Sequence, residues 1–394
     1  MNLDSLLPDL AERIATIRRD IHAHPELAFH ENRTADVVAA HLEAAGVEVH
    51  RGLARTGVVG RISCGSGSRA IGLRADMDAL PLAELNDFLH RSQHEGKMHA
   101  CGHDGHTAML LGAAEALVAL RDQGGFDGTV YLIFQPAEEH EGGGKVMVEE
   151  GLFQRFPMEM VFGLHNWPGL AAGSFAVMEG PVMAGADRFE ITVSGRGGHA
   201  AMPHQGTDTI LAGSALVQTL QSLVSRVTDP LEPAVVSVTR FHAGHADNVL
   251  PEQAVLGGTV RTFSPELQDA LEQGMRRICQ GIEITHRVQV SVKYERGYPP
   301  TINAAAPTAI CREVAQRVAG KGAGVHANLK PSMGAEDFAY LSQAVPGCYV
   351  WLGNGPGEGG CMLHSPHYDF NDAIIASGIR YWVTLVGAVL PLKG

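Results

Sequence analysis

Short apolar runs of about strand length alternate with stretches of helical periodicity along residues 1–185. This alternation predicts an α/β layer fold with a largely parallel sheet. Three of the apolar runs lead directly into polar residues of ligand-binding type: 70–73 into Asp76 and Asp78, 130–134 into Glu138 and Glu139, and 160–164 into His165. Because open α/β sheets bind ligands at the carboxyl ends of their strands, we expect these side chains to lie at one edge of the sheet.

The pattern changes near residue 186. Four strand-like and two helix-like stretches follow in the order β-α-β-β-α-β: RFEITVSG, residues 207–224, AVVSVTRF, AVLGGTVRTF, residues 265–280 and VQVSVKYE. This order predicts a ferredoxin-like α+β sandwich inserted into the first domain. We expect residues 1–185 and 299–394 to form the larger domain and residues 186–298 to form the insert.

Length and composition agree with a folded protein of two domains. A chain of 394 residues exceeds the size at which one core keeps growing, and 45% apolar with 19% charged residues is ordinary for a globular protein. The formal net charge of −13 disfavours a general nucleic-acid binder, because such proteins need clustered lysine and arginine.

The sequence favours a cytoplasmic protein without a membrane partner. Its amino-terminal stretch contains acids and lacks the basic and apolar regions of a secretory signal. The apolar stretch from Ala108 to Leu120 is too short to span a bilayer and contains Glu115. The six cysteines are scattered without a CxxC pair, which indicates neither a disulfide framework nor a zinc ribbon.

Histidine and cysteine concentrate in one short segment, at His90, His94, His99, Cys101, His103 and His106. Cys101 and His103 are two residues apart, so a turning loop can aim a thiolate and an imidazole at one cation that accepts both sulfur and nitrogen. Taken alone, so short a pair fits a structural or solvated loop equally well.

Two adjacent carboxylates, Glu138 and Glu139, follow Pro136 at the end of a buried-type strand. Such neighbours can divide the work, because one can bind a metal while the other takes a proton from the water that the metal activates. The alternative is a solvated acidic turn. His165 and His364 add two candidate ligands, although a lone histidine is more often structural.

The coincidence of these groups favours a metal site over the separate structural explanations. Three strand ends and one loop present nitrogen, sulfur and oxygen ligands toward one edge of the expected sheet, and open coordination positions there would suit hydrolysis. The sequence contains no GxSxG motif, which removes the commonest serine-hydrolase interpretation.

A series of strings spread over nearly the whole chain resembles one enzyme family. They are RRDIHAHPELAFHE, LRADMDALP, MHACGHDGHTAMLLGAA, FQPAEE, GLHNWP, GRGGHAAMPH, NVLP, GGTVRTF, MGAEDF and HSPHYDF. The chain is similar to the amidohydrolases that include hippurate hydrolase, bacterial N-acyl amino acid hydrolases and plant indole-acetyl-amino acid hydrolases. That resemblance, within the wider aminoacylase and carboxypeptidase G-like group, implies a metallopeptidase-like catalytic domain with an inserted dimerisation domain.

The resemblance also implies a ligand set for two divalent metal ions: Cys101, His103, Glu139, His165 and His364. The thiolate of Cys101 would bridge the two ions. In the same picture Glu138 is the general base, and Asp78 orients a ligand from behind the site.

The chain departs from the wider group at two positions. Where many relatives have a His-x-Asp motif and a bridging aspartate, this chain has Asp76-Met77-Asp78 and Cys101, as the hippurate hydrolase branch does. A thiolate favours zinc, whereas relatives with this arrangement are linked with manganese, nickel or cobalt. The resemblance therefore leaves manganese, zinc, nickel and cobalt as the candidate ions.

Three residues of the insert match functional positions of the family. The histidine equivalent to His199 stabilises the oxyanion, in many relatives in the active site of the partner subunit. Asn248 and Arg261 match positions that hold the substrate carboxylate, a task suited to a planar guanidinium. Without the resemblance, both residues fit ordinary surface polarity equally well. The insert also offers an edge strand and a helix face for pairing, so a homodimer is expected and a homotetramer is the alternative.

The resemblance implies hydrolysis of small N-acyl-L-amino acids, such as hippurate, to a carboxylic acid and a free amino acid. Deacetylation of N-acetyl-diaminopimelate or cleavage of a dipeptide would use the same machinery. A metal-binding protein without catalysis is the alternative from another class, and the presence of Glu138 weakens it. A further alternative is a cysteine nucleophile, Cys101, paired with His103 or His106; such an enzyme would keep its activity after chelation.

Overall fold

The computed structural model describes residues 3–320, 323–356 and 361–392. The chain divides into two compact units. Unit 1 consists of Met1–Val182, Ile302–Lys330 and Asp337–Gly394, and unit 2 of Met183–Thr301 with Pro331–Glu336. The segment Pro331–Glu336 groups with unit 2 because Ser332 bridges Met183 and accepts a hydrogen bond from the amide of Ala184. The expected insert, residues 186–298, did not include this segment.

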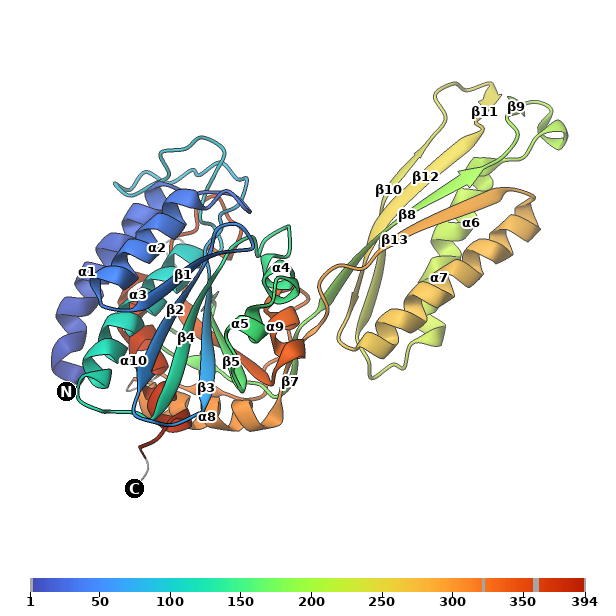
Figure 1. The fold of residues 1–394 in the computed structure, drawn as a ribbon. Coiled ribbons are helices and arrows are strands. Elements are labelled where there is room, and N and C mark those ends of the chain that lie inside the picture. The colour runs from blue at the N-terminus through green and yellow to red at the C-terminus, as the bar shows by residue number, and fades with distance from the viewer. Residues whose placement is uncertain (1–2, 321–322, 357–360, 393–394) are drawn as a thin grey trace. The chain divides into compact units, whose positions relative to one another are not determined.

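Unit 1 is built on an eight-stranded sheet of order β1-β2-β4-β3-β5-β16-β6-β15 (Figure 1). The strands are β1 (Glu48–Leu53), β2 (Gly57–Cys64), β3 (Ala70–Asp76), β4 (Gly128–Gln135), β5 (Met160–Pro168), β6 (Phe175–Ala176), β15 (Val325–His326) and β16 (Gly347–Gly355). The central strands β4, β3, β5 and β16 run parallel to one another. At one edge β2 pairs antiparallel with β4 and β1 pairs antiparallel with β2, and toward the other edge β6 pairs antiparallel with β16. The predicted mostly parallel α/β fold is confirmed.

Helices cover both faces of this sheet (Figure 1). On one side lie α1 (Leu3–Ala23), α2 (Asn32–Ala44), α3 (His103–Arg121) and α10 (Ile375–Val389), with α8 (Ala305–Val318) against α10; α4 (Gly143–Glu149), α5 (Leu152–Arg155) and α9 (Phe338–Ala344) lie on the other. Because both faces are covered, every residue of β3 and β16 is buried. Such strands read as continuous apolar runs in the sequence.

Two apolar helices form the centre of the helical layer. The apolar stretch around Glu115 lies inside α3, whose residues are buried along most of its length. The segment Asp372–Val389 is long and apolar enough to cross a bilayer by length and composition alone. However, 56% of it is buried, and α10 packs against α1, α3 and α8. It therefore serves as a core helix of unit 1.

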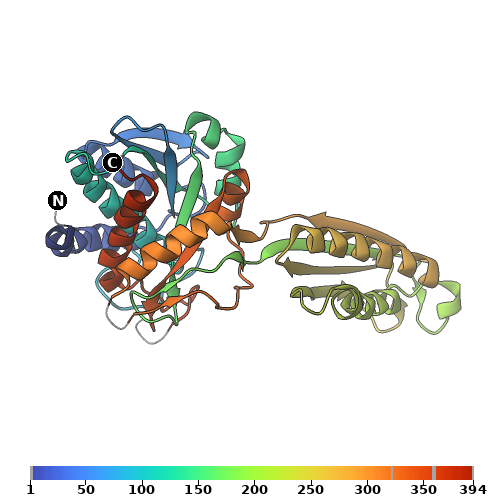
Figure 2. The same ribbon diagram turned by 90° about the horizontal axis from the view of Figure 1, so that it is seen from below.

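Unit 2 has a four-stranded antiparallel sheet of order β10-β12-β8-β13, with α6 and α7 packed together on one face (Figure 1, Figure 2). Its elements are β8 (Gly185–Ser194), α6 (Thr209–Ser222), β10 (Ala234–Ala243), β12 (Gln253–Thr262), α7 (Pro265–His286) and β13 (Gln289–Glu295), with a small ribbon of β9 (Gly198–His199) and β11 (Val249–Leu250). This is the predicted β-α-β-β-α-β order.

Side-chain caps set the start of both helices of unit 2. The carboxylate of Asp208 accepts a hydrogen bond from the amide of Leu211, and the hydroxyl of Ser264 accepts one from the amide of Leu267. The end of α7 was predicted at residue 280, but the helix continues to His286. Buried Ile282 packs in the core of unit 2 and extends the helix despite its β-branched side chain.

Candidate metal centre

The carboxyl ends of three neighbouring strands supply most of the candidate ligands. Asp76 ends β3 and Asp78 follows it, while Glu138 lies three residues beyond the end of β4. His165 lies inside β5, because this strand continues to Pro168 and pairs there with β16. The sequence pattern had placed His165 just past a strand end.

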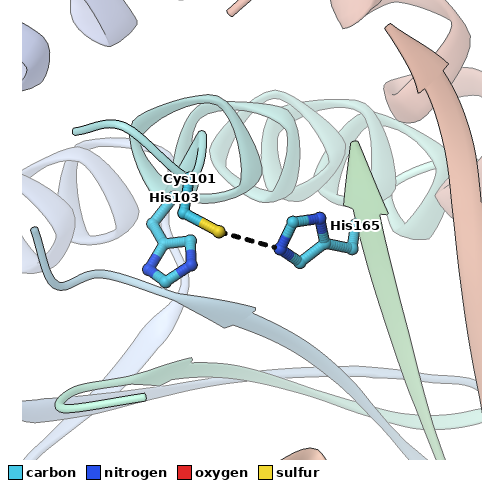
Figure 3. A group of neighbouring side chains, drawn as sticks. All are labelled: Cys101, His103 and His165. Atoms are coloured by element: carbon cyan, nitrogen blue, oxygen red, sulfur yellow. Dashed lines mark hydrogen bonds between the residues drawn. The ribbon is translucent and has the colours of Figure 1, made fainter. Parts of the chain in front are cut away.

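Cys101 and His103 sit where the chain enters α3 (Figure 3). Gly102, between them, has a φ of 90°, a backbone conformation that side chains other than glycine rarely adopt. A Cβ atom at this position would lie 2.2 Å from Oδ1 of Asn166 and 2.7 Å from the hydroxyl of Tyr368. The tight turn therefore needs glycine, and it directs the thiol and the imidazole to the same side.

The turn that carries the adjacent carboxylates is held from a distant part of the chain. Ala137 has a positive φ of 57°, and its amide donates a hydrogen bond to Oε1 of Glu31 at 2.9 Å. Burial raises the pKa of Glu31 to about 7, although hydrogen bonds such as the one from Thr56 lower it. This fixed turn keeps the side chains of Glu138 and Glu139 only 8% and 7% exposed instead of leaving them in a solvated loop.

The five proposed ligand residues and Glu138 form a single cluster. Sγ of Cys101 lies 3.5 Å from Nε2 of His165 (Figure 3). Nε2 of His103 lies 3.8 Å from Oε1 of Glu139 and 3.9 Å from Oε2 of Glu138. Nε2 of His364 lies 3.4 Å from Oε2 of Glu139. These separations suit atoms that share one or two cations.

Hydrogen bonds orient two of the imidazoles. Nδ1 of His165 donates to the carbonyl of Asn166 at 2.7 Å, and Nδ1 of His103 donates to Oδ1 of Asp78 at 3.2 Å. Both Nε2 atoms are left as acceptors that face the cluster. The other oxygen of Asp78 accepts a hydrogen bond from the amide of Glu139 at 2.9 Å. Asp78 therefore positions two candidate ligands at once.

We expect Asp78→Asn to weaken metal binding by about tenfold to a hundredfold, because the amide cannot accept from both His103 and Glu139 as the carboxylate does. Titration of the metal-free protein with Mn²⁺ by calorimetry measures the change. The exposed Asp9→Asn variant serves as the control and should bind as the unchanged protein does. An affinity within twofold of that control would show that Asp78 does not position the ligands.

The electrostatics of the cluster fit a bound cation. Among the described residues, Nε2 of His103 and Oε1 of Glu139 are buried without a hydrogen-bond partner, which is costly unless another group meets them. Burial lowers the pKa of His103, but nearby carboxylates, Asp76 first, raise it to about 10. Burial raises the pKa of Cys101 well above its usual value, and the nearby glutamates raise it further. The carboxylates around these sulfur and nitrogen atoms thus favour positive charge in the cluster, which a divalent ion would supply.

His106 belongs to a second network that the sequence did not assign. Its Nδ1 lies 2.6 Å from Oδ1 of Asp76, and its Nε2 lies 2.6 Å from Oδ1 of Asn166. The helical spacing from His103 places both rings on one face of α3, which is the signal that could have identified it. The alternative of a Cys101 nucleophile needs His103 or His106 as its partner. Within the described residues, neither imidazole forms a hydrogen bond with the sulfur of Cys101, which instead faces His165.

The structure places the other three predicted site residues in unit 2, where His199 and Asn248 are neighbours and Arg261 lies apart from both. His199 pairs with Val249 in the β9–β11 ribbon, next to Asn248, whose carbonyl accepts from the amide of Ala200. Strand β12 begins at Gln253, shortly after the β11 strand that follows Asn248. Arg261 lies near the other end of β12, roughly 25 Å from Gln253 at the usual rise per strand residue. In one chain, Asn248 and Arg261 are too far apart to contact the same carboxylate.

Comparisons with known proteins give consistent matches. Residues 72–388 match the family described as Peptidase family M20/M25/M40. The chain is 40% identical to hippurate hydrolase of Campylobacter jejuni over 385 residues, 98% of each chain. It is 44% identical to an N-acyl-L-amino acid amidohydrolase of Geobacillus stearothermophilus over 300 residues, 76% of this chain and 80% of the relative.

A solved structure of a metal-binding relative shares this fold. It is a dinuclear metal-binding peptidase from the M20 family of Bacillus subtilis, 35% identical, with a TM-score of 0.84 over 97% of this chain and 99% of that chain. Its description as dinuclear applies to that protein, and the cluster described above offers enough ligand atoms for a comparable centre.

Proposed function

Because the chain belongs to the M20/M25/M40 peptidase family, we propose that it is a metal-dependent amidohydrolase that cleaves the amide bond of small N-acyl-L-amino acids such as hippurate. The products are a carboxylic acid and a free amino acid. The observation that carries this proposal is the cluster of ligand atoms, largely buried apart from the exposed His364, with Glu138 directly beside it.

In this proposal two divalent ions are held by five residues: Cys101, His103, Glu139, His165 and His364. Manganese, zinc, nickel or cobalt ions held there would polarise the scissile carbonyl and make a water molecule more acidic. Glu138, which is 6% exposed, takes the proton of the attacking water and passes it to the nitrogen of the departing amine. Asp78 keeps His103 and Glu139 in position during these steps.

We assign substrate contacts in the insert to His199, Asn248 and Arg261. His199 stabilises the oxyanion, while Asn248 and Arg261 bind the carboxylate of the amino acid. Because Asn248 and Arg261 lie far apart in one chain, the proposal requires two chains for one complete site. Arg261 then comes from one protomer, and His199 with Asn248 from its partner.

A homodimer through unit 2 satisfies this requirement, and the surface around edge strand β10 supports it. Apolar side chains on this strand and on the adjacent α6 are exposed: Ile210, Leu211, Val235 and Phe241. Backbone groups at the free edge of β10 are open to pairing with a second copy. The opposite edge strand, β13, presents mainly polar side chains. Pairing of β10 and α6 across a two-fold axis is therefore favoured over pairing through β13.

We expect Leu211→Asp to sediment as a monomer of 41.9 kDa at concentrations where the unchanged protein is a dimer. The reason is that Leu211 is 58% exposed on α6, and a carboxylate there would be buried without a partner in the interface. Ile284→Asp on α7, 82% exposed, provides the matched control and should leave the dimer intact. Dissociation by Ile284→Asp with an intact Leu211→Asp dimer would place the interface on α7 instead.

The competing functions make different demands on the same site. Deacetylation of N-acetyl-diaminopimelate or dipeptide cleavage would retain the metal cluster and Glu138 and change only the substrate pockets. A metal-binding protein without catalysis would have no use for a carboxylate beside the cluster. The position of Glu138 therefore favours an enzyme. We assign the enzyme to the cytoplasm, where its six free cysteines would stay reduced.

A panel of substrates tests the proposal: hippurate, N-acetyl-methionine, N-acetyl-diaminopimelate, indole-acetyl-aspartate and a dipeptide. The protein loaded with Mn²⁺ or Zn²⁺ should release the amino acid from N-acyl amino acids faster than it cleaves the dipeptide. Fastest cleavage of the dipeptide would identify a peptidase. Binding of metal without turnover of any compound would support the binding protein.

A further inference from the structure

The face of the unit 2 sheet opposite α6 and α7 carries a pocket of about 420 Å³. The apolar side chains of β8 and β12 point toward the helices, so the open face presents polar and charged side chains instead. Four cations, Arg188, Arg240, Arg261 and Lys293, and two carboxylates, Glu190 and Glu295, line the pocket. The pocket is therefore positively charged overall.

The two carboxylates of the pocket are already used by two of its cations. Arg240 lies 3.3 Å from Glu190, and Lys293 lies 2.5 Å from Glu295. Among the described residues, Arg188 and Arg261 form no ion pair with any carboxylate. The positive charge of the pocket is thus concentrated on these two arginines.

Arg188 and Arg261 are diagonal neighbours on adjacent strands. Arg188 pairs with Thr259 in the register of β8 and β12, and Arg261 pairs with Ala186, so the two side chains stand side by side on the open face. Burial lowers the pKa of Arg261, and the charge of Arg188 lowers it further. Two like charges held together without an acid between them are unfavourable until an anion joins them.

Asp187, which directly precedes Arg188 in the sequence, does not relieve the repulsion between the two arginines by pairing with either of them. Asp187 points to the other face of the sheet, where its carboxylate accepts hydrogen bonds from the side-chain amide of Gln268 at 2.6 Å and the hydroxyl of Tyr294 at 2.7 Å. Although Asp187 raises the pKa of Arg261, its oxygens are engaged elsewhere. The arginine pair therefore remains available for an external anion.

We propose that Arg188 and Arg261 bind the two carboxylates of one substrate molecule, so that the preferred substrates are N-acyl derivatives of glutamate or aspartate. This inference rests on the proposed function, in which Arg261 binds the carboxylate common to all N-acyl amino acids. Arg188 adds a second planar guanidinium beside it. The two carboxylates of an acidic amino acid are separated by only a few bonds, which suits neighbouring arginines better than distant ones.

N-benzoyl-glutamate and N-benzoyl-glutamine test the proposal, because they differ only in the charge of the side chain. The metal-loaded enzyme should show about a tenfold or larger preference in kcat/KM for the glutamate compound, as expected for charge-assisted hydrogen bonds at a partly exposed site. Arg188→Gln should remove this preference by lowering kcat/KM for the glutamate compound to about the value for the glutamine compound. Arg277→Gln, an exposed arginine on α7 across the sheet, should keep it.

A binding measurement separates this proposal from the function on which it rests. Calorimetry with the metal-free full-length protein should give tighter binding of N-benzoyl-glutamate than of N-benzoyl-glutamine, and Arg188→Gln should make the two affinities equal. Turnover of hippurate without any preference for glutamate would overturn the role of Arg188 and leave the amidohydrolase intact. A glutamate preference that survives in Arg188→Gln would also overturn it. Failure to hydrolyse every N-acyl amino acid would instead contradict the proposed function.

Discussion

Replacing Glu138 with glutamine is expected to lower kcat for hippurate hydrolysis by about 10²–10⁴-fold while the protein still binds its metal ions. Glutamine keeps the size of the side chain but cannot take the proton of the attacking water. The carboxylate lies 3.9 Å from Nε2 of His103, at the border of the ligand cluster but outside the proposed ligand set. Steady-state kinetics together with metal analysis of the same samples measure both properties.

The control for this variant is Glu141→Gln, which changes an exposed carboxylate in the same segment and should leave kcat unchanged. A Glu138→Gln enzyme that retains full metal content and more than a tenth of the unchanged kcat would contradict the assignment of the general base. A variant that loses its metal would instead show that Glu138 is itself a ligand.

Replacing Arg18 with methionine is expected to lower the free energy of unfolding of unit 1 by about 3–5 kcal/mol. The Arg18 side chain is 1% exposed, with Nε 2.8 Å from Asp372 and Nη1 2.8 Å from Asp369. Nη1 also lies 3.4 Å from Asp104, the residue that follows His103. Methionine fills similar space but leaves these carboxylates without their shared cation.

Tryptophan fluorescence during denaturation by urea measures this effect in unit 1, because all three tryptophans, Trp167, Trp351 and Trp382, belong to that unit. The control is Arg13→Met, which lies on the same helix as Arg18, α1, and removes a partly exposed ion pair with Glu115 of α3. This variant should lower the free energy of unfolding by less than about 1 kcal/mol. Equal and small losses in the two variants would mean that the buried network contributes little to stability.

The pattern of apolar and polar residues within short stretches predicted the main strands of unit 1 and the order of elements in unit 2. The strands that precede Asp78 and Glu138 are buried on both faces, so their continuous apolar runs were visible in the sequence. The short strands β6 and β15 were not predicted, because two residues carry no periodicity. The return of Pro331–Glu336 to unit 2 depends on hydrogen bonds across a long sequence separation, which no local pattern encodes.

The candidate site shows the same division between local and distant causes. Cys101 and His103 were found from their spacing, and the strand ends indicated which other groups would join them. The hydrogen bonds of His106 to Asp76 and Asn166 join three separate segments, so spacing alone could not reveal them. Arg188 resembles any surface arginine in the sequence, and only strand register places it beside Arg261.

The most direct test of the amidohydrolase proposal is hippurate hydrolysis measured before chelation, after chelation, and after return of Mn²⁺, Zn²⁺, Ni²⁺ or Co²⁺. We predict that chelation abolishes turnover and that at least one of these ions restores it to the original rate. Turnover that persists in protein shown to be free of metal would contradict the two-metal mechanism and would direct attention to Cys101 as a nucleophile.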